Sequence, residues 1–86
     1  MAEKDAPQVQ QARLRRLLEQ LMPGYTMQFT DEASTFLKFR IDDEKGTTVG
    51  VLPGEYHSSV IADKSDRQVE EIILRAINKQ KEMLRE

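Results

Sequence analysis

The strongest pattern in the first part of the chain is a helical repeat of apolar positions over residues 5–24. On a helix these positions share one side, while arginines and glutamines occupy the other. The apolar side consists of Val9, Ala12, Leu14, Leu17, Leu18 and Leu21. Asp5 with Gln8 has the spacing of an N-cap and capping box, Pro7 suits a first turn, and Pro23-Gly24 stops a helix. An amphipathic helix is therefore predicted before Pro23.

From Tyr25 the hydrophobic period changes to two residues, which is typical of a half-buried β-strand. Three segments have this period, at residues 25–30, 34–42 and 47–52. The apolar positions that share a face are Tyr25, Met27 and Phe29, then Leu37, Phe39 and Ile41, then Val49 and Val51. Because the connections are short, the segments are predicted to form an antiparallel meander of three strands.

The connections also predict the register of this meander. Glu44-Lys45-Gly46, with Gly46 in the left-handed conformation, is a three-residue turn that keeps the apolar faces together. The cross-strand pairs predicted in this way are Ile41 with Val49, Phe39 with Val51, Phe29 with Leu37, and Met27 with Phe39. Gly50, inside the third strand, indicates a bulge or the close approach of another backbone.

The segment YHSSVIA, residues 56–62, follows LPGE at residues 52–55, which favours a type II turn. It is a candidate fourth strand with two possible registers. One register turns Tyr56, Ser58 and Val60 toward the core, and the other turns His57, Ser59 and Ile61 there. We favour the first, because it buries an aromatic ring and leaves the histidine in solvent.

The last segment, from Ser65 onward, has the clearest helical pattern of the chain. Ser65 and Gln68 have capping-box spacing, and Glu71 stands four residues before Arg75, the favourable order for an ion pair. The apolar positions repeat along one side at Val69, Ile72, Ile73, Ala76, Ile77 and Leu84. A second amphipathic helix is therefore predicted.

These elements predict an α+β fold, a two-layer sandwich of order α-β-β-β(-β)-α. Both helices cover the apolar face of the antiparallel meander, because each helix has one apolar stripe to bury. We expect one domain over residues 1–86, with residues 1–5 and 83–86 frayed. The other sheet face is left open. It is expected to carry Thr26, Gln28, Thr30, Phe36, Lys38, Arg40, Thr48 and Leu52.

Composition narrows the classes of function. The 86 residues are 38% hydrophobic and 33% charged, which suits a small folded domain with a thin core. The chain has no cysteine, so disulfides and thiolate metal sites are excluded, and small domains without them often recruit a second subunit. No stretch resembles a secretory signal or a membrane span, so a cytoplasmic location is expected. The net charge of −2 disfavours general binding to nucleic acid.

Residues with catalytic or metal-binding chemistry are few. His57 stands beside Ser58 and Ser59, but neighbouring residues of a strand point to opposite faces and no nucleophile-elbow pattern is present. The acidic run Asp42-Asp43-Glu44 ends in a glycine turn and lacks the spacing of a calcium loop. We therefore expect no enzymatic activity, no cofactor and no metal ion.

The leading hypothesis is a small protein-interaction domain that self-associates as a homodimer through its open sheet face or an edge strand. Phe36 and Leu52 are apolar residues that a solvated face has little use for, and Lys38 and Arg40 accompany them. These four residues form the predicted partner-binding set.

The alternative hypothesis is a nucleic-acid-binding module. It combines Phe36, Lys38 and Arg40 with the basic residues of the first helix, which are Arg13, Arg15 and Arg16. The element order is similar to that of double-stranded-RNA-binding domains. The second helix of those domains opens with a lysine-rich motif, whereas the corresponding segment here reads SDRQVEE.

Overall fold

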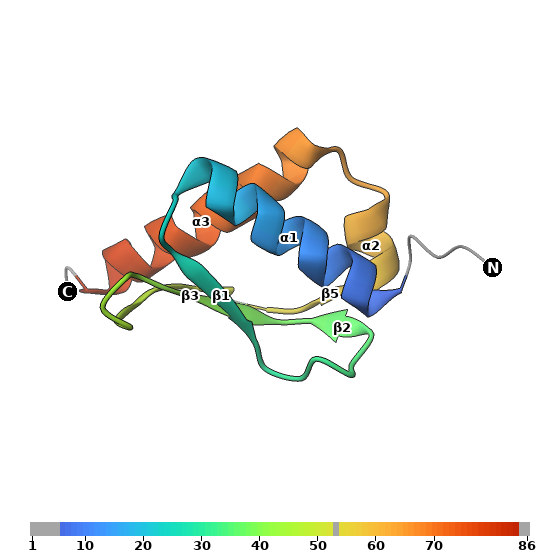
Figure 1. The fold of residues 1–86 in the computed structure, drawn as a ribbon, viewed down its shortest axis with the longest axis horizontal. Coiled ribbons are helices and arrows are strands. Elements are labelled where there is room, and N and C mark those ends of the chain that lie inside the picture. The colour runs from blue at the N-terminus through green and yellow to red at the C-terminus, as the bar shows by residue number, and fades with distance from the viewer. Residues whose placement is uncertain (1–5, 53, 85–86) are drawn as a thin grey trace.

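A computed structural model describes residues 6–52 and 54–84 of the chain. Its elements in order are α1 (Pro7–Leu21), β1 (Thr26–Phe29), β2 (Phe36–Leu37), β3 (Phe39–Asp42), β4 (Thr48–Val51), β5 (Tyr56–His57), α2 (Ser58–Ala62) and α3 (Asp66–Leu84). The strands form an antiparallel three-stranded sheet of order β1-β3-β4 and a two-stranded extension of β2 with β5. The helices lie together on one face of these strands (Figure 1). The predicted α+β sandwich is confirmed, with α2 as an additional short helix.

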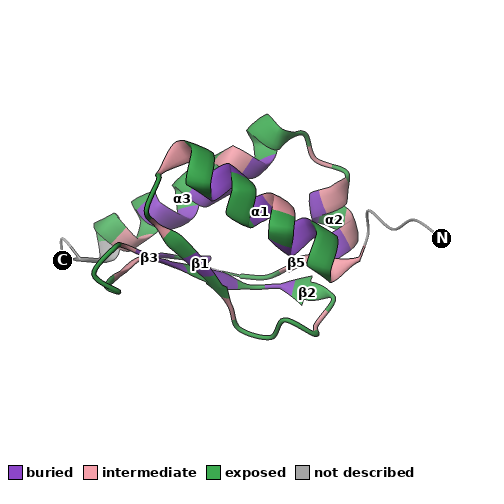
Figure 2. Cartoon of the chain, in the orientation of Figure 1, coloured by how far each residue is buried: buried purple, intermediate pink, exposed green. Residues whose placement is uncertain are grey.

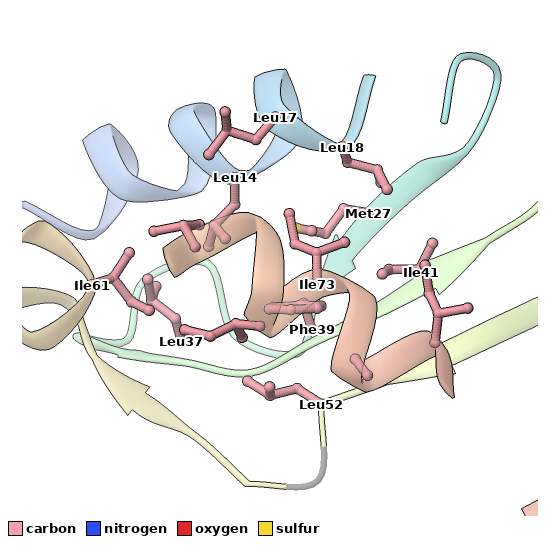
Figure 3. Close-up of a cluster of buried hydrophobic side chains, with 14 residues drawn as sticks. Leu14, Leu17, Leu18, Met27, Leu37, Phe39, Ile41, Leu52, Ile61 and Ile73 are labelled. Atoms are coloured by element: carbon pink, nitrogen blue, oxygen red, sulfur yellow. The ribbon is translucent and has the colours of Figure 1, made fainter. Parts of the chain in front are cut away.

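The core lies between the two layers, where the buried positions of helices and strands face one another (Figure 2). Leucines of α1 and isoleucines of α3 meet Met27, Phe39 and Ile41 of the sheet (Figure 3). The buried apolar residues are Leu14, Leu17, Leu18, Met27, Leu37, Phe39, Ile41, Leu52, Ile61, Val69, Ile72, Ile73, Ala76 and Ile77. This set spans every helix of the described chain, so the two layers share one core.

Helix α1 begins at Pro7 and ends at Leu21, followed by Gly24 with a φ of +91°. The predicted cap, Asp5, lies outside the described residues. The prediction that Val9 and Ala12 join the buried side is wrong, since both are exposed. At 100° per residue, Val9 lies about 130° around the helix from the centre of the leucine stripe.

Strands β1 and β3 pair two residues away from the predicted register, with Met27 opposite Ile41 and Phe29 opposite Phe39. A shift of two residues leaves every side chain on its predicted face. The shift arises in the connection from Asp31 to Thr35. There Asp31 Oδ1 accepts a hydrogen bond from the Ala33 N–H at 3.0 Å, which adds an Asx turn before β2.

The side chains at the end of strand β4 point to the opposite faces from those predicted. The turn itself is as predicted: the Asp43 N–H donates to the Thr47 oxygen at 2.8 Å, and Gly46 has a φ of +85°. A bulge at Val49, between the pairs Asp42–Thr48 and Ile41–Gly50, then shifts the register by one residue, so Gly50 rather than Val49 lies opposite Ile41. The predicted pairs of Ile41 with Val49 and Phe39 with Val51 are therefore wrong.

Residues 56–62 form a fourth strand only at Tyr56–His57, which pairs with Phe36–Leu37, and then enter α2. The favoured register for a full strand is wrong at Val60, which is exposed, whereas Ile61 is buried. Within a helix, Ser58 and Ile61 share one face because they are three residues apart.

Helix α3 is capped as its sequence indicates. The Ser65 N–H donates to Gln68 Oε1 at 2.9 Å, and the Gln68 N–H donates to Ser65 Oγ at 3.3 Å. The predicted apolar side is buried from Val69 to Ile77. The helix continues to Leu84, while residues 1–5 and 85–86, which belong to the segments predicted to fray, are not among those described.

Candidate functional site

The sheet face turned away from the helices, here called the open face, carries two large exposed apolar side chains. Phe36 of β2 is 48% exposed and Val51 of β4 is 37% exposed. Val51 lies opposite Arg40 in the register, and Gln28 lies opposite Arg40 from the other side. The open face is therefore a mixture of apolar and polar side chains.

Phe36 is held in place by its own backbone and by its neighbour. Its N–H donates to Ser34 Oγ at 3.0 Å, and its cross-strand partner is His57. The two rings meet edge to face, with centroids 5.2 Å apart and planes at 85°. A T-shaped ring pair is favourable, so the exposed phenyl group has a preferred orientation before any partner arrives.

His57 serves as the N-cap of α2. Its Nδ1 accepts a hydrogen bond from the Ser59 N–H at 3.2 Å and lies 2.8 Å from Ser59 Oγ. Accepting from a backbone N–H leaves Nδ1 without its proton in the neutral ring. Histidine and serine are residue types used in nucleophilic catalysis, but here the Nδ1 lone pair faces a cap N–H. The half-buried ring also departs from the solvent position predicted for it.

The charges on the open face are predominantly basic. Lys38 and Arg40 are exposed, and the Arg40 Nε lies 3.5 Å from Asp42 Oδ2. Asp42 is itself buried and accepts a hydrogen bond from Thr48 Oγ1 at 2.9 Å. The carboxylate is thus drawn into the sheet, while the two cations extend from it.

The prediction that Leu52 lies on the open face is wrong. Leu52 is 3% exposed and belongs to the core, because the bulge at Val49 exchanges the two faces of β4. Val51 takes its place on the open face. The sequence signal for this exchange was Gly50, a glycine inside a strand, which indicated a bulge without saying which neighbour it would turn outward.

The basic residues of α1 are engaged within the chain. Arg13, with a side chain only 16% exposed, donates to Asp66 Oδ1 at 2.8 Å, to the Ile61 oxygen at 2.9 Å and to the Lys64 oxygen at 2.6 Å. Arg16 lies 3.6 Å from the second oxygen of Asp66. These contacts tie α1 to the end of α2, to the connection after it and to the start of α3.

Arg15 extends in a different direction, toward β1. Its guanidinium lies 4.9 Å from the Phe29 ring centroid, its Nε donates to the Met27 oxygen at 3.3 Å, and it pairs with Glu32 at 3.0 Å. The three arginines therefore do not join Lys38 and Arg40 in one basic patch.

In the acidic run at the end of β3, Asp43 is explained by the turn that it forms. Asp43 Oδ1 accepts hydrogen bonds from the Lys45 and Thr47 N–H groups, each at 2.9 Å. Within residues 6–52 and 54–84, no group of three or more histidine, aspartate or glutamate side chains is arranged to hold a metal ion. In the same part of the chain, no helix is both long and apolar enough to cross a bilayer.

Comparison with known proteins gives no family for this chain. Neither protein-family models, nor curated proteins, nor solved structures produced a match. A functional proposal therefore depends on the geometry of the open face and of the sheet edges.

Proposed function

We propose that this chain is a non-enzymatic protein-interaction domain whose open face binds an acidic segment of another protein. The observation that carries the proposal is Phe36, a large apolar ring that is half exposed yet oriented by its backbone and by His57. A ring that is already oriented loses little conformational entropy on binding, so its burial adds directly to affinity.

The charge of the face selects the kind of partner. Lys38 and Arg40 follow Phe36 at every second residue on the same face and are exposed, while Asp42 is withdrawn and paired with Thr48 and Arg40. Carboxylates of a partner are attracted to the two cations, and an aliphatic side chain of the partner can cover the phenyl ring. Two copies meeting face to face would bring like charges together, so this face suits a different protein.

Nucleic acid is the second candidate for the same face, because a phenyl ring can stack on a base while nearby cations pair with phosphates. The contacts of Arg13, Arg15 and Arg16 within the chain weaken this alternative, since they occupy donors that phosphates would need. The net charge of −2 weakens it further.

The experiment compares two labelled ligands by fluorescence anisotropy at low salt. One is a short peptide of glutamates around a Leu-Val pair, and the other is an oligothymidine strand. We expect the peptide to bind and Phe36→Ser to weaken its binding, while Lys38→Glu abolishes the attraction for the glutamates. If only oligothymidine binds, the open face is a nucleic-acid-binding site and the protein-interaction proposal is wrong.

The matched controls change the same chemistry elsewhere. Val60 is an exposed apolar residue on α2, and Lys79 is an exposed lysine on α3. Val60→Ser and Lys79→Glu are expected to leave peptide binding unchanged. Equal losses for the control and test variants would show that charge or hydrophobicity in general, not the open face, governs binding.

A cytoplasmic location is part of this proposal and stays a prediction from composition.

A further inference from the structure

The two edges of the three-stranded sheet differ in how they are covered. At β4, the Leu52 N–H donates to the Phe39 oxygen at 3.0 Å, which makes these two residues a hydrogen-bonded pair. Since such pairs alternate along an antiparallel ladder, the N–H and C=O of Val51 point away from β3 toward the outer edge. At β1, by contrast, the Arg15 side chain already donates to the Met27 oxygen.

An unpaired edge is a template for another strand, and natural proteins protect such edges with charges. Strand β4 carries none, because its sequence is Thr-Val-Gly-Val. The bulge at its start keeps the open edge short. A short uncharged edge permits pairing over a few residues without inviting extended aggregation.

The helix above this edge also presents an exposed apolar residue. A Cβ on Gly50 of β4 would lie 3.0 Å from Ile77 Cγ1, which shows how closely α3 covers the strand. Leu74 stands three residues before Ile77 on the same side of α3, yet is 42% exposed. Leu74 of α3 and Val51 of β4 are thus exposed apolar side chains on the two elements that meet at Ile77 and Gly50.

Along α3, an acidic residue precedes Leu74 and Ile77 and a basic residue follows them, so an antiparallel second copy of the helix presents the opposite charge at each end. Glu70, Leu74, Ile77 and Lys81 are spaced as one stripe along α3. The midpoint between Glu70 and Lys81 falls between Leu74 and Ile77, close to the point where Ile77 meets Gly50. A two-fold axis at the β4 edge therefore places Glu70 of each copy near Lys81 of the other.

From this arrangement we infer that the chain forms a homodimer by antiparallel pairing of β4 with β4 of a second copy. The two sheets join into one, Leu74 packs across the two-fold axis, and Glu70 pairs with Lys81 of the partner subunit. The dimer places both open faces on the same side of the joined sheet. A partner with two acidic segments then gains effective concentration from binding both faces. The dimer does not depend on what the open face binds, so the two proposals can fail separately.

The test uses sedimentation velocity across a concentration series to about 1 mM, because an interface this short is expected to be weak. Leu74→Lys places two like charges at the axis and should weaken association about tenfold or more. Val60→Lys is the matched control on a different surface and should leave association unchanged. A wild-type chain that stays monomeric throughout the series overturns the proposal.

Charge exchange gives a second and more specific readout. Glu70→Lys and Lys81→Glu should each dissociate, since each variant alone brings like charges together. An equimolar mixture of the two variants restores both unlike pairs and should form a heterodimer. Urea titration of each variant checks that the fold is kept. Folded single variants that dimerise like wild type, or a mixture that stays monomeric, place the contact elsewhere.

Phe36→Ser separates the dimer from the proposed function. It should leave sedimentation unchanged while weakening peptide binding at the open face. Loss of the dimer in this variant would mean that self-association uses the open face instead of the β4 edge.

Discussion

Replacing Gly50 by alanine is a sharp test of how α3 packs on the sheet. An added Cβ would lie 3.0 Å from Ile77 Cγ1 and 3.2 Å from both the Cα and the N of Ile77. Carbon atoms in favourable contact are about 3.5–4.0 Å apart. A side-chain carbon can rotate away, but the two backbone atoms belong to the helix, so α3 as a whole must move.

The magnitude follows from two opposing effects. Overpacking of a filled core destabilises by about 1–3 kcal/mol. Replacing glycine by alanine also removes freedom from the unfolded chain, which stabilises by about 0.4–1 kcal/mol. The expected net loss is roughly 1–2 kcal/mol, or a decrease in Tm of several degrees for a domain of this size.

Urea titration followed by circular dichroism at low protein concentration measures the loss. Gly54→Ala is the matched control, because nothing lies within 4 Å of a Cβ there. Both variants change the unfolded chain alike, so the difference between them isolates the contact with Ile77. Equal stabilities for the two variants would refute the close packing of α3 against β4.

Three further substitutions test the rest of the fold by the same titration. Ile73→Ala empties a fully buried site and should cost about 2–5 kcal/mol; a loss below about 1 kcal/mol would contradict the assigned core. Ser65→Ala removes the N-cap of α3 and should cost about 0.5–2 kcal/mol, whereas Ser65→Asp should retain most of the stability. Arg13→Met removes the guanidinium that donates to the Ile61 and Lys64 oxygens and should cost about 1–3 kcal/mol, with no loss indicating that backbone N–H groups and water satisfy these oxygens without it.

The candidate site was partly accessible from sequence. Phe36, Lys38 and Arg40 lie on the open face as the alternation of β2 and β3 predicts, because a shift of two residues cannot exchange the faces of a strand. The faces of Leu52 and Val51 are opposite to those predicted, because a bulge adds one residue to β4. The role of His57 as a cap was missed, since a capping histidine before SSVIA has no periodic signal.

Local chemistry determined the elements of this protein. The signals for these elements each depend on residues close together in the chain. They are the spacing of leucines and isoleucines, the capping box of Ser65 and Gln68, and the glycine at position 46. The sequence alone therefore specifies two helices and a hairpin turn. Those signals also establish that both apolar stripes must cover one sheet face, since no other surface could bury them.

Tertiary contacts decided everything that depends on the distance between elements. Whether Val49 or Gly50 faces α3 depends on the approach of Ile77, which fits only a residue without a side chain. The arginines of α1 find their acceptors at Asp66 and Met27, residues that the fold alone brings near. Local propensity cannot encode such choices, because the competing arrangements differ only in how side chains from distant segments pack.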